Sequence, residues 1–478
     1  MKNNGTDLAV IARYETGVKI SVGGKSMATS RIKNMTEGRP ASLIFTFALP
    51  LMAGNVFQQL YTVIDTMVVG KALGVNALAA LGAADWLNWM MLGIIQGFTQ
   101  GFAILMAQKF GAGKHQELRR VIGNSAVLSL LSALVLLGIG QLFARPILVL
   151  LQTPQEILGN ALLYLRIMFW GIPIVMSYNL LACVLRSLGD GQTPLHAMIV
   201  AALTNIALDL LFVLVFHLGI GGAAAATLIA QLVSSLFCLY HIRKIQILAF
   251  VRSDFCLQGG LPLRLLLLGF PMAFQNAIIA IGGMIVQFVV NGFGVLFIAG
   301  FTATNKLYGI LEIAATSYGY AMITYVGQNL GANRTDRIRK GMRSAVFIAL
   351  ATSVLIAVFM LLAGRAILGC FISGTPEEFE QTLQIAYFYL VIMSLFLPVL
   401  YILHVTRSAI QGMGNTVLPM VSGVAEFVMR AATAILLPLL VGEIGIFFAE
   451  IMAWAGATVI LVISYFVVVK KVERGLTA

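Results

Sequence analysis

The chain has 478 residues, of which 59% are hydrophobic and only 10% are charged. Soluble proteins carry about 25% charged residues, so this chain has too little polar surface to cover a water-soluble globule. Apolar runs of about 20 residues recur along the whole length, which excludes a soluble domain on a single anchor. The formal charge of +12 does not indicate a nucleic-acid partner, because the bases lie in short segments between apolar runs. The expected surroundings are a lipid bilayer.

The first 40 residues are basic and contain no apolar run, which predicts a disordered cytoplasmic tail over 1–40, with Met27 as an alternative start. The stretch from Gly17 to Ser26 resembles a phosphate loop, but Lys19 stands where the Walker A motif requires glycine. Without a nucleotide-binding motif, a primary pump is not expected. The four cysteines are far apart and form no CxxC pair, so neither a disulfide framework nor a metal site is indicated.

Apolar runs separated by polar breaks predict about twelve membrane-spanning helices. Several runs approach 30 residues, so these helices are expected to tilt or to extend beyond the bilayer. The predicted spans are 41–70, 77–107, 121–143, 157–185, 194–217, 221–242, 263–291, 297–326, 341–363, 379–406, 416–440 and 444–469.

The positions of the basic residues predict the orientation of these spans. Most of the 31 Lys and Arg residues fall in the tail and in every second connection, whereas Lys71, Arg145 and Arg365 fall on the other side. Because basic loops stay in the cytoplasm, both termini are expected there. The predicted organisation is an amino-terminal lobe at 41–243, a cytoplasmic linker at 244–262, a carboxy-terminal lobe at 263–469 and a cytoplasmic carboxy-terminus at 470–478.

The two lobes carry the same signals in the same order. The stretch "AQKFGAGKHQELRR" from Ala107 and the stretch "GQNLGANRTDRIRK" from Gly327 share a core and lie about 220 residues apart. "ALPLM" corresponds to "GFPMA", and "LGDGQTPL" corresponds to "QGMGNTVL". Each repeat has six spans, so the two lobes are predicted to be related by a pseudo-twofold axis along the membrane normal, with a cleft between them.

Polar residues within the predicted spans indicate a cation site in the amino-terminal lobe. A rise of about 1.5 Å per residue places Asp65, Asp209 and Thr227 at one depth, roughly 8–12 Å below the outer surface. Asn205 shares a helix face with Asp209, and Tyr61 shares one with Asp65. These oxygens could bind a proton or Na⁺, since two close carboxylates in a low dielectric do not both ionise readily. The alternative is that these groups only bond one another and hold the bundle together.

The other charged residues within the predicted spans are weaker evidence for a functional site than this cluster. Glu426 and Arg430 lie four residues apart on one helix, which is typical of a structural ion pair. Glu312 is expected to face the cleft and attract cations, and Asp85 occupies the repeat position of Asn305. We therefore regard Tyr61, Asp85, Glu312 and Glu426 as candidates for a substrate cleft. No partner is evident in the sequence for Glu450, His404, Arg166 or Lys306.

The sequence resembles the multidrug and toxic compound extrusion (MATE) family, and within it the bacterial DinF-like branch. The similarity covers about nine tenths of the chain and is carried by "LYTVIDTMVVGKALG", "AQKFGAGK", "RSLGDGQTP", "TNIALDLLF", "GGAAAATLIAQ" and "GQNLGA". It implies twelve helices in two lobes, a place in a bacterial inner membrane, and a cation site at Asp65, Asn205, Asp209 and Thr227. The other bacterial branch has a glutamate where Ile279 stands, so the same carboxylate site is not expected in the carboxy-terminal lobe.

The leading hypothesis is a secondary antiporter that exports amphipathic organic cations in exchange for H⁺ or Na⁺, with no other cofactor and no resident metal. A monomer would suffice, because the duplication already provides both lobes. The alternative keeps the fold but exports or flips a lipid-linked or endogenous metabolite. A membrane enzyme is not expected, because the loops contain mostly Lys, Arg, Gly and Gln rather than paired acids or His/Asp motifs.

Overall fold

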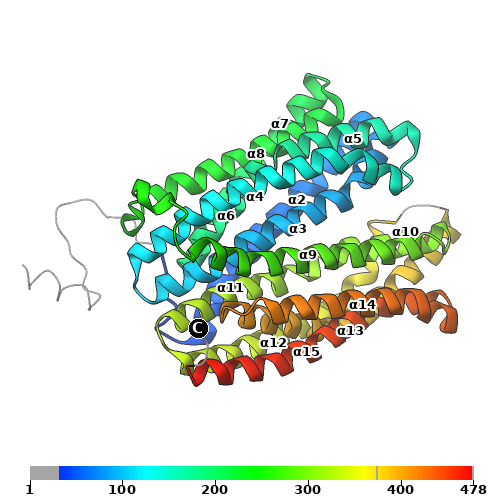
Figure 1. Ribbon diagram of the computed structural model, residues 1–478. Helices are drawn as coiled ribbons and strands as arrows, with labels where there is room; N and C mark the ends of the chain where they lie inside the picture. Colours follow the sequence, from blue (N-terminus) through cyan, green and yellow to red (C-terminus); the bar gives the residue numbers. More distant parts are fainter. Residues whose placement is uncertain (1–31, 373–374, 476–478) are drawn as a thin grey trace, which may run out of the picture. The chain divides into compact units, whose positions relative to one another are not determined.

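The computed structural model describes residues 32–372 and 375–475, and all regular secondary structure in these ranges is helical. The first half contains α2 (Pro40–Leu73), α3 (Val75–Gly111), α4 (His115–Leu150), α5 (Gln155–Trp170), α6 (Ile172–Ser187), α7 (Gln192–Asp209), η1 (Leu210–Val215) and α8 (Gly219–Arg243). The second half contains α9 (Leu261–Val290), α10 (Val295–Leu311), α11 (Ile313–Gly331), α12 (Thr335–Gly369), α13 (Pro376–Gly412), α14 (Val417–Val441), η4 (Glu443–Phe448) and α15 (Ala449–Glu473) (Figure 1).

The helices match a multi-pass membrane protein. By length and composition, ten of the described helices can each cross a membrane, and α5 with α6 forms an eleventh candidate that bends by 48°. The span expected at 297–326 corresponds to α10 and α11, which are separated at Glu312. Large apolar side chains such as Leu362 and Phe288 are about four-fifths exposed, as expected where lipid rather than water surrounds the helices. The predicted class, an all-helical membrane protein, is confirmed.

The segment just before α2 is folded onto the second half of the chain. Met35 is fully buried, its amide donates to Gln328 Oε1 at 2.8 Å, and its carbonyl accepts from Asn329 Nδ2 at 3.1 Å. Arg337 Nη2 donates to the Gly38 carbonyl at 3.0 Å. Of the tail expected at 1–40, residues 1–31 lie outside the described residues, whereas 32–39 follow a defined path against α11 and α12.

The repeated glutamine–glycine motif forms a reciprocal contact between the two halves. We call this contact, made by Gln108, Gly111, Gln328 and Gly331, the glutamine interlock. Gln108 Nε2 donates to the Gly412 carbonyl at the end of α13 (3.2 Å), and Gln328 Nε2 donates to the Ser187 carbonyl at the end of α6 (2.8 Å). Each glutamine therefore satisfies a helix end of the other half.

The two glycines of the interlock allow the backbones of α3 and α11 to touch. A Cβ atom on Gly111 would lie 2.0 Å from the Gln328 carbonyl oxygen, and one on Gly331 would lie 1.9 Å from the Gln108 carbonyl oxygen. Real Cβ atoms do not approach so closely, so both positions require glycine. The interlock therefore holds the halves together on the side where α2 begins and α15 ends, which we call the terminal side.

A second seam between the halves runs along α3 and α9, which lie side by side in Figure 1. Gly97 and Gly101 place the α3 backbone directly against Ala273 and Gly269, because a Cβ atom at either glycine would lie 2.4 Å from the α9 backbone. Asn276 Nδ2 donates to the Gly93 carbonyl at 2.8 Å farther along the seam. The segment at 244–262 that joins the halves packs on α4, where Arg119 lies 3.6 Å from Asp254.

Candidate functional site

The four residues predicted for the cation site lie together in the first half. Asp65 is on α2, Asn205 and Asp209 are on α7, and Thr227 is on α8, and α7 packs against both α2 and α8. Asn205 Nδ2 lies 3.4 Å from Thr227 Oγ1, and the carboxyl groups of Asp65 and Asp209 are close enough to interact directly. Asn205 and Asp209 are fully buried, and Asp65 is only 9% exposed.

The oxygens of this cluster lack hydrogen-bond donors. Among the described residues, nothing donates to Asp65 Oδ1, Asn205 Oδ1 or either carboxylate oxygen of Asp209. A buried acceptor without a partner costs about 1–3 kcal/mol, and more when it is charged. A proton shared between Asp65 and Asp209 would satisfy one oxygen of each carboxyl group, and carboxylate, amide and hydroxyl oxygens are also the ligands of a hard cation. The cluster is chemically suited to take up positive charge.

The backbone changes its geometry at this cluster. The α-helix α7 ends at Asp209, and the next six residues, Leu210–Val215, form the π-helical turn η1. Single π-turns within helices are rare and are found frequently at functional sites. The run LLFVLV is uniformly apolar, so the sequence offers no local signal for the change.

Further polar side chains surround the cluster. The Tyr61 hydroxyl lies within hydrogen-bonding reach of Gln231, and both Tyr61 and Tyr164 lie within electrostatic range of the two carboxylates. Sequence reasoning named Tyr61 but not the other two. Gln231 follows Thr227 by four residues on α8, so the same i, i+4 rule applied to Thr227 would have found it. Tyr164, on α5, has no such signal.

Asp85, which was predicted to line the substrate cleft with Glu312 and Glu426, does not lie beside these acids of the second half. It interacts electrostatically with Lys306 of α10 and with Asp65, so it lies between the amino-terminal cluster and the second half. The described residues contain no group of three His, Cys, Asp or Glu side chains able to hold a metal ion.

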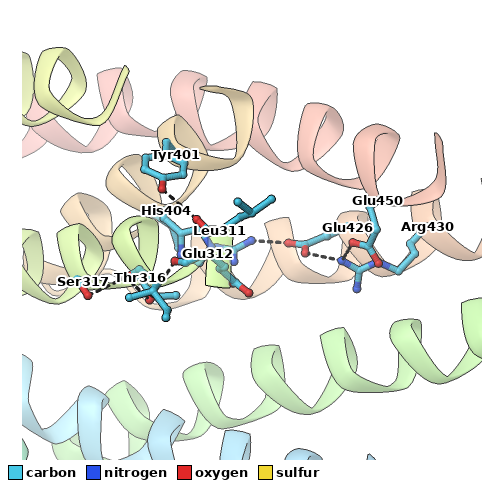
Figure 2. A network of polar contacts seen from close by, with 11 residues as sticks. Leu311, Glu312, Thr316, Ser317, Tyr401, His404, Glu426, Arg430 and Glu450 are labelled. Carbon is cyan, nitrogen blue, oxygen red and sulfur yellow. Dashed lines mark hydrogen bonds and ion pairs between the residues drawn. The ribbon is translucent and has the colours of Figure 1, made fainter. Parts of the chain in front are cut away.

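The second half contains a row of charged side chains, which Figure 2 shows from Glu312 to Glu450. Glu426 accepts from Arg407 at 2.6 Å and from Arg430 at 3.1 Å, and Arg430 also reaches Glu450 at 2.7 Å. The expected Glu426–Arg430 contact is present, but it belongs to a row of four charges. We call this row, Arg407, Glu426, Arg430 and Glu450, the ion-pair row.

Glu426 and Glu312, which were both predicted to line a substrate cleft, lie in different surroundings. Glu426 is 4% exposed and held by two guanidinium groups, so it lies inside the lobe rather than on an accessible wall. Glu312 is partly exposed and contacts only His404 among charged groups of the described residues. Arg430 Nη1 also donates to the Ile279 carbonyl at 3.1 Å, so an arginine lies beside the position where the other bacterial branch has its glutamate.

A duplicated helical membrane bundle with an unsatisfied acidic cluster inside one lobe defines a membrane transporter. The sequence profile of the MatE family matches residues 50–211 and 271–436. The chain therefore belongs to the MatE family, whose members are membrane transporters and not enzymes.

Curated relatives and solved structures agree with this assignment. The probable multidrug resistance protein YoeA of Bacillus subtilis is 29% identical over 71% of this chain and 74% of its own length. An FAD transporter of Shewanella oneidensis is 25% identical over 63% of this chain and 67% of its own length. The fold matches that of a MOP superfamily transporter from Pyrococcus furiosus, described as having a binding pocket of reversed polarity, with a TM-score of 0.87 over 94% of this chain and 100% of that one, at 20% identity.

Proposed function

We propose that the protein exports amphipathic organic cations in exchange for H⁺ or Na⁺, and that the coupling ion binds at Asp65, Asn205, Asp209 and Thr227. The four unsatisfied oxygens of this cluster are the observation that carries the proposal. Relatives named as multidrug resistance proteins support the substrate class. Both termini and the 244–262 linker would then face the cytoplasm, where basic loops are retained.

The mechanism follows from the charge of the cluster. With both carboxylates ionised, the first half attracts an organic cation toward Tyr61 and Asp85. Uptake of H⁺ or Na⁺ from outside neutralises the carboxylates, removes that attraction and lets α2 bend at Pro50, which lies inside the helix. The coupling ion and the drug therefore compete, which is sufficient for exchange. One chain contains both lobes, so a monomer can complete the cycle.

The test is efflux of a fluorescent organic cation from proteoliposomes under either a pH gradient or a Na⁺ gradient. One of the two gradients should drive efflux by the wild type, and Asp65→Asn should reduce efflux to the rate seen without a gradient. Asp336→Asn removes an exposed carboxylate and should leave efflux unchanged. If Asp65→Asn remains fully coupled to the gradient, the cluster is not the coupling site.

A second candidate substrate is an anionic metabolite, and Arg186 is the observation that favours it. This guanidinium lies 4.6 Å over the ring of Tyr320 and 3.1 Å from Cys183 Sγ, and within the described ranges it forms no ion pair with a carboxylate. An anionic group could therefore bind there. If neither gradient moves the organic cation but FAD is transported in the same vesicles, the anionic metabolite becomes the better assignment.

A further inference from the structure

Glu312 lies where α10 meets α11 in the second half. It is the residue after α10 and the residue before α11, and its own backbone hydrogen bonds continue across this point, because its amide donates to the Tyr308 carbonyl at 3.0 Å and its carbonyl accepts from the Thr316 amide at 3.0 Å. The Leu311 carbonyl accepts from the Tyr401 hydroxyl of α13 at 2.9 Å, and the Glu312 carbonyl accepts from Thr316 Oγ1 at 3.2 Å. Side chains thus add hydrogen bonds to the carbonyls where α10 meets α11, and α13 supplies one of these side chains (Figure 2).

The same helix α13 supplies the partner of the Glu312 side chain. His404 Nε2 lies 3.3 Å from Glu312 Oε1, and the two side chains are 17% and 30% exposed. Farther along α11, Tyr320 is also partly exposed and accepts from Gln100 of α3 at 3.4 Å. Glu312, Thr316 and Tyr320 are spaced four residues apart, so they share the helix face that α11 turns toward the first half.

The charges next to this pair already cancel. Arg407, Glu426, Arg430 and Glu450 alternate in sign along the ion-pair row, so together they carry no net charge. Arg407 is held by Glu426 at 2.6 Å and is therefore not available to balance Glu312. The charge state of His404 then decides the local sum: minus one when the imidazole is neutral, and zero when it is protonated.

Most other ionisable groups that face the pair are phenols or members of the neutral row, and Arg186, which lies over the Tyr320 ring about two turns along α11, keeps its positive charge on both sides of neutral pH. The groups are Tyr308 of α10, Tyr320 of α11, Tyr401 and Arg407 of α13, Glu426 and Arg430 of α14 and Glu450 of α15, with Arg186 of α6 over the Tyr320 ring. The helices α2 and α3 present the amides Asn55, Gln59 and Gln100 to α10 and α11, and α12 presents Thr352.

We propose that Glu312 and His404 form a second site, in the carboxy-terminal lobe, that binds one positive charge, either a proton on His404 or the cationic group of the exported substrate. When the organic cation pairs with the Glu312 carboxylate, the His404 imidazolium loses its proton to water, so one positive charge enters as one leaves. This inference rests on the proposed function and adds a second point at which drug and proton exclude one another.

The test is calorimetric titration of the purified full-length chain with tetraphenylphosphonium at pH 6 and pH 8. Running each titration in two buffers of different ionisation enthalpy gives the number of protons released per cation bound. Wild type should bind more tightly at pH 8 and release protons at pH 6. Glu312→Gln should weaken binding at pH 8 by about 10- to 100-fold, because it removes the charge–charge attraction between the half-buried carboxylate and a cation that has no hydrogen-bond donor.

His404→Gln separates the two roles of the pair, because it keeps the carboxylate and removes the titrating group. We expect its affinity at pH 8 to stay within about twofold of wild type, while the protons released at pH 6 fall by up to one. Adding His404→Gln to Glu312→Gln should change nothing further. Glu443→Gln and His115→Gln, at exposed positions on the surface, are the matched controls.

Two results would overturn the inference, and they differ from failure of the proposed function. Affinity unchanged in Glu312→Gln, or proton release unchanged in His404→Gln, removes the second site even if Asp65→Asn abolishes coupling. If wild type does not bind tetraphenylphosphonium at either pH, the cation-export proposal fails and the second site fails with it. Thermal unfolding of each variant identifies any that lose the fold, and in that case Glu312→Asp replaces the amide and should retain part of the affinity.

Discussion

Gly331→Ala should open the terminal side of the protein. The added Cβ atom would lie 1.9 Å from the Gln108 carbonyl oxygen, whereas ordinary van der Waals contact begins near 3.4 Å. The helices α3 and α11 must therefore separate by about 1.5 Å at this point, against backbone atoms that have no rotamer to change. Overpacking of this kind costs about 1–3 kcal/mol. This cost destabilises only the states in which α3 and α11 touch at the glutamine interlock, which we call the closed states.

A penalty of that size changes the equilibrium constant between the closed and the open terminal side by about 5- to 150-fold. Spin labels at His115 and Asp336 lie on exposed positions of α4 and α12, one in each half. With the four native cysteines replaced, electron–electron distance measurements in nanodiscs should show a longer population that grows in the variant.

The control is Gly138→Ala, because a Cβ atom at Gly138 meets nothing within 4 Å. If Gly331→Ala and Gly138→Ala give the same distance distribution, the glycine contact does not hold the terminal side closed. Gln108→Ala should have a smaller effect than Gly331→Ala, since it removes one hydrogen bond without adding an overlap.

Two further predictions concern stability. Arg430→Gln leaves the buried Glu426 and the half-buried Glu450 without their shared guanidinium and should lower the free energy of unfolding by about 3–5 kcal/mol. The exposed ion pair of Arg365 is the control, and Arg365→Gln should cost no more than about 1 kcal/mol in the same denaturation assay. Gly341→Ala would place a Cβ atom 2.1 Å from Tyr325 Cε1 and should lower the midpoint of thermal unfolding, and a midpoint equal to wild type would show that the Tyr325 ring can move aside.

The sequence predicted the helices well where apolarity alone decides their extent. The run expected at 263–291 forms α9 at Leu261–Val290, and the run expected at 41–70 forms α2 at Pro40–Leu73. The separation of α10 from α11 at Glu312 could not be predicted from apolarity, because no proline marks it, whereas the 48° bend at Gly171 lies next to Pro173 in the first turn of α6. The folded segment around Met35 was also missed, since its burial comes from polar partners nearly 300 residues away.

The two clusters of charged residues differ in how far the sequence could predict them. Depth and i, i+4 spacing were enough to group Asp65 with Asp209, although these residues lie on the first and fifth predicted spans and only the fold shows that α2 packs against α7. They were not enough to connect Glu426 with Arg407 and Glu450. That contact depends on how α13 and α15 are rotated about their axes, and apolar runs that are hydrophobic on all sides do not indicate rotation.

The glutamine interlock also bears on the origin of the chain. Each half offers one glutamine and receives the other at the equivalent helix end, which is the pattern made by two identical subunits around a twofold axis. A single half therefore carries both sides of its own interface. Two copies of one six-helix half could close the terminal side with the same two bonds, and joining them into one chain would require no new contact there.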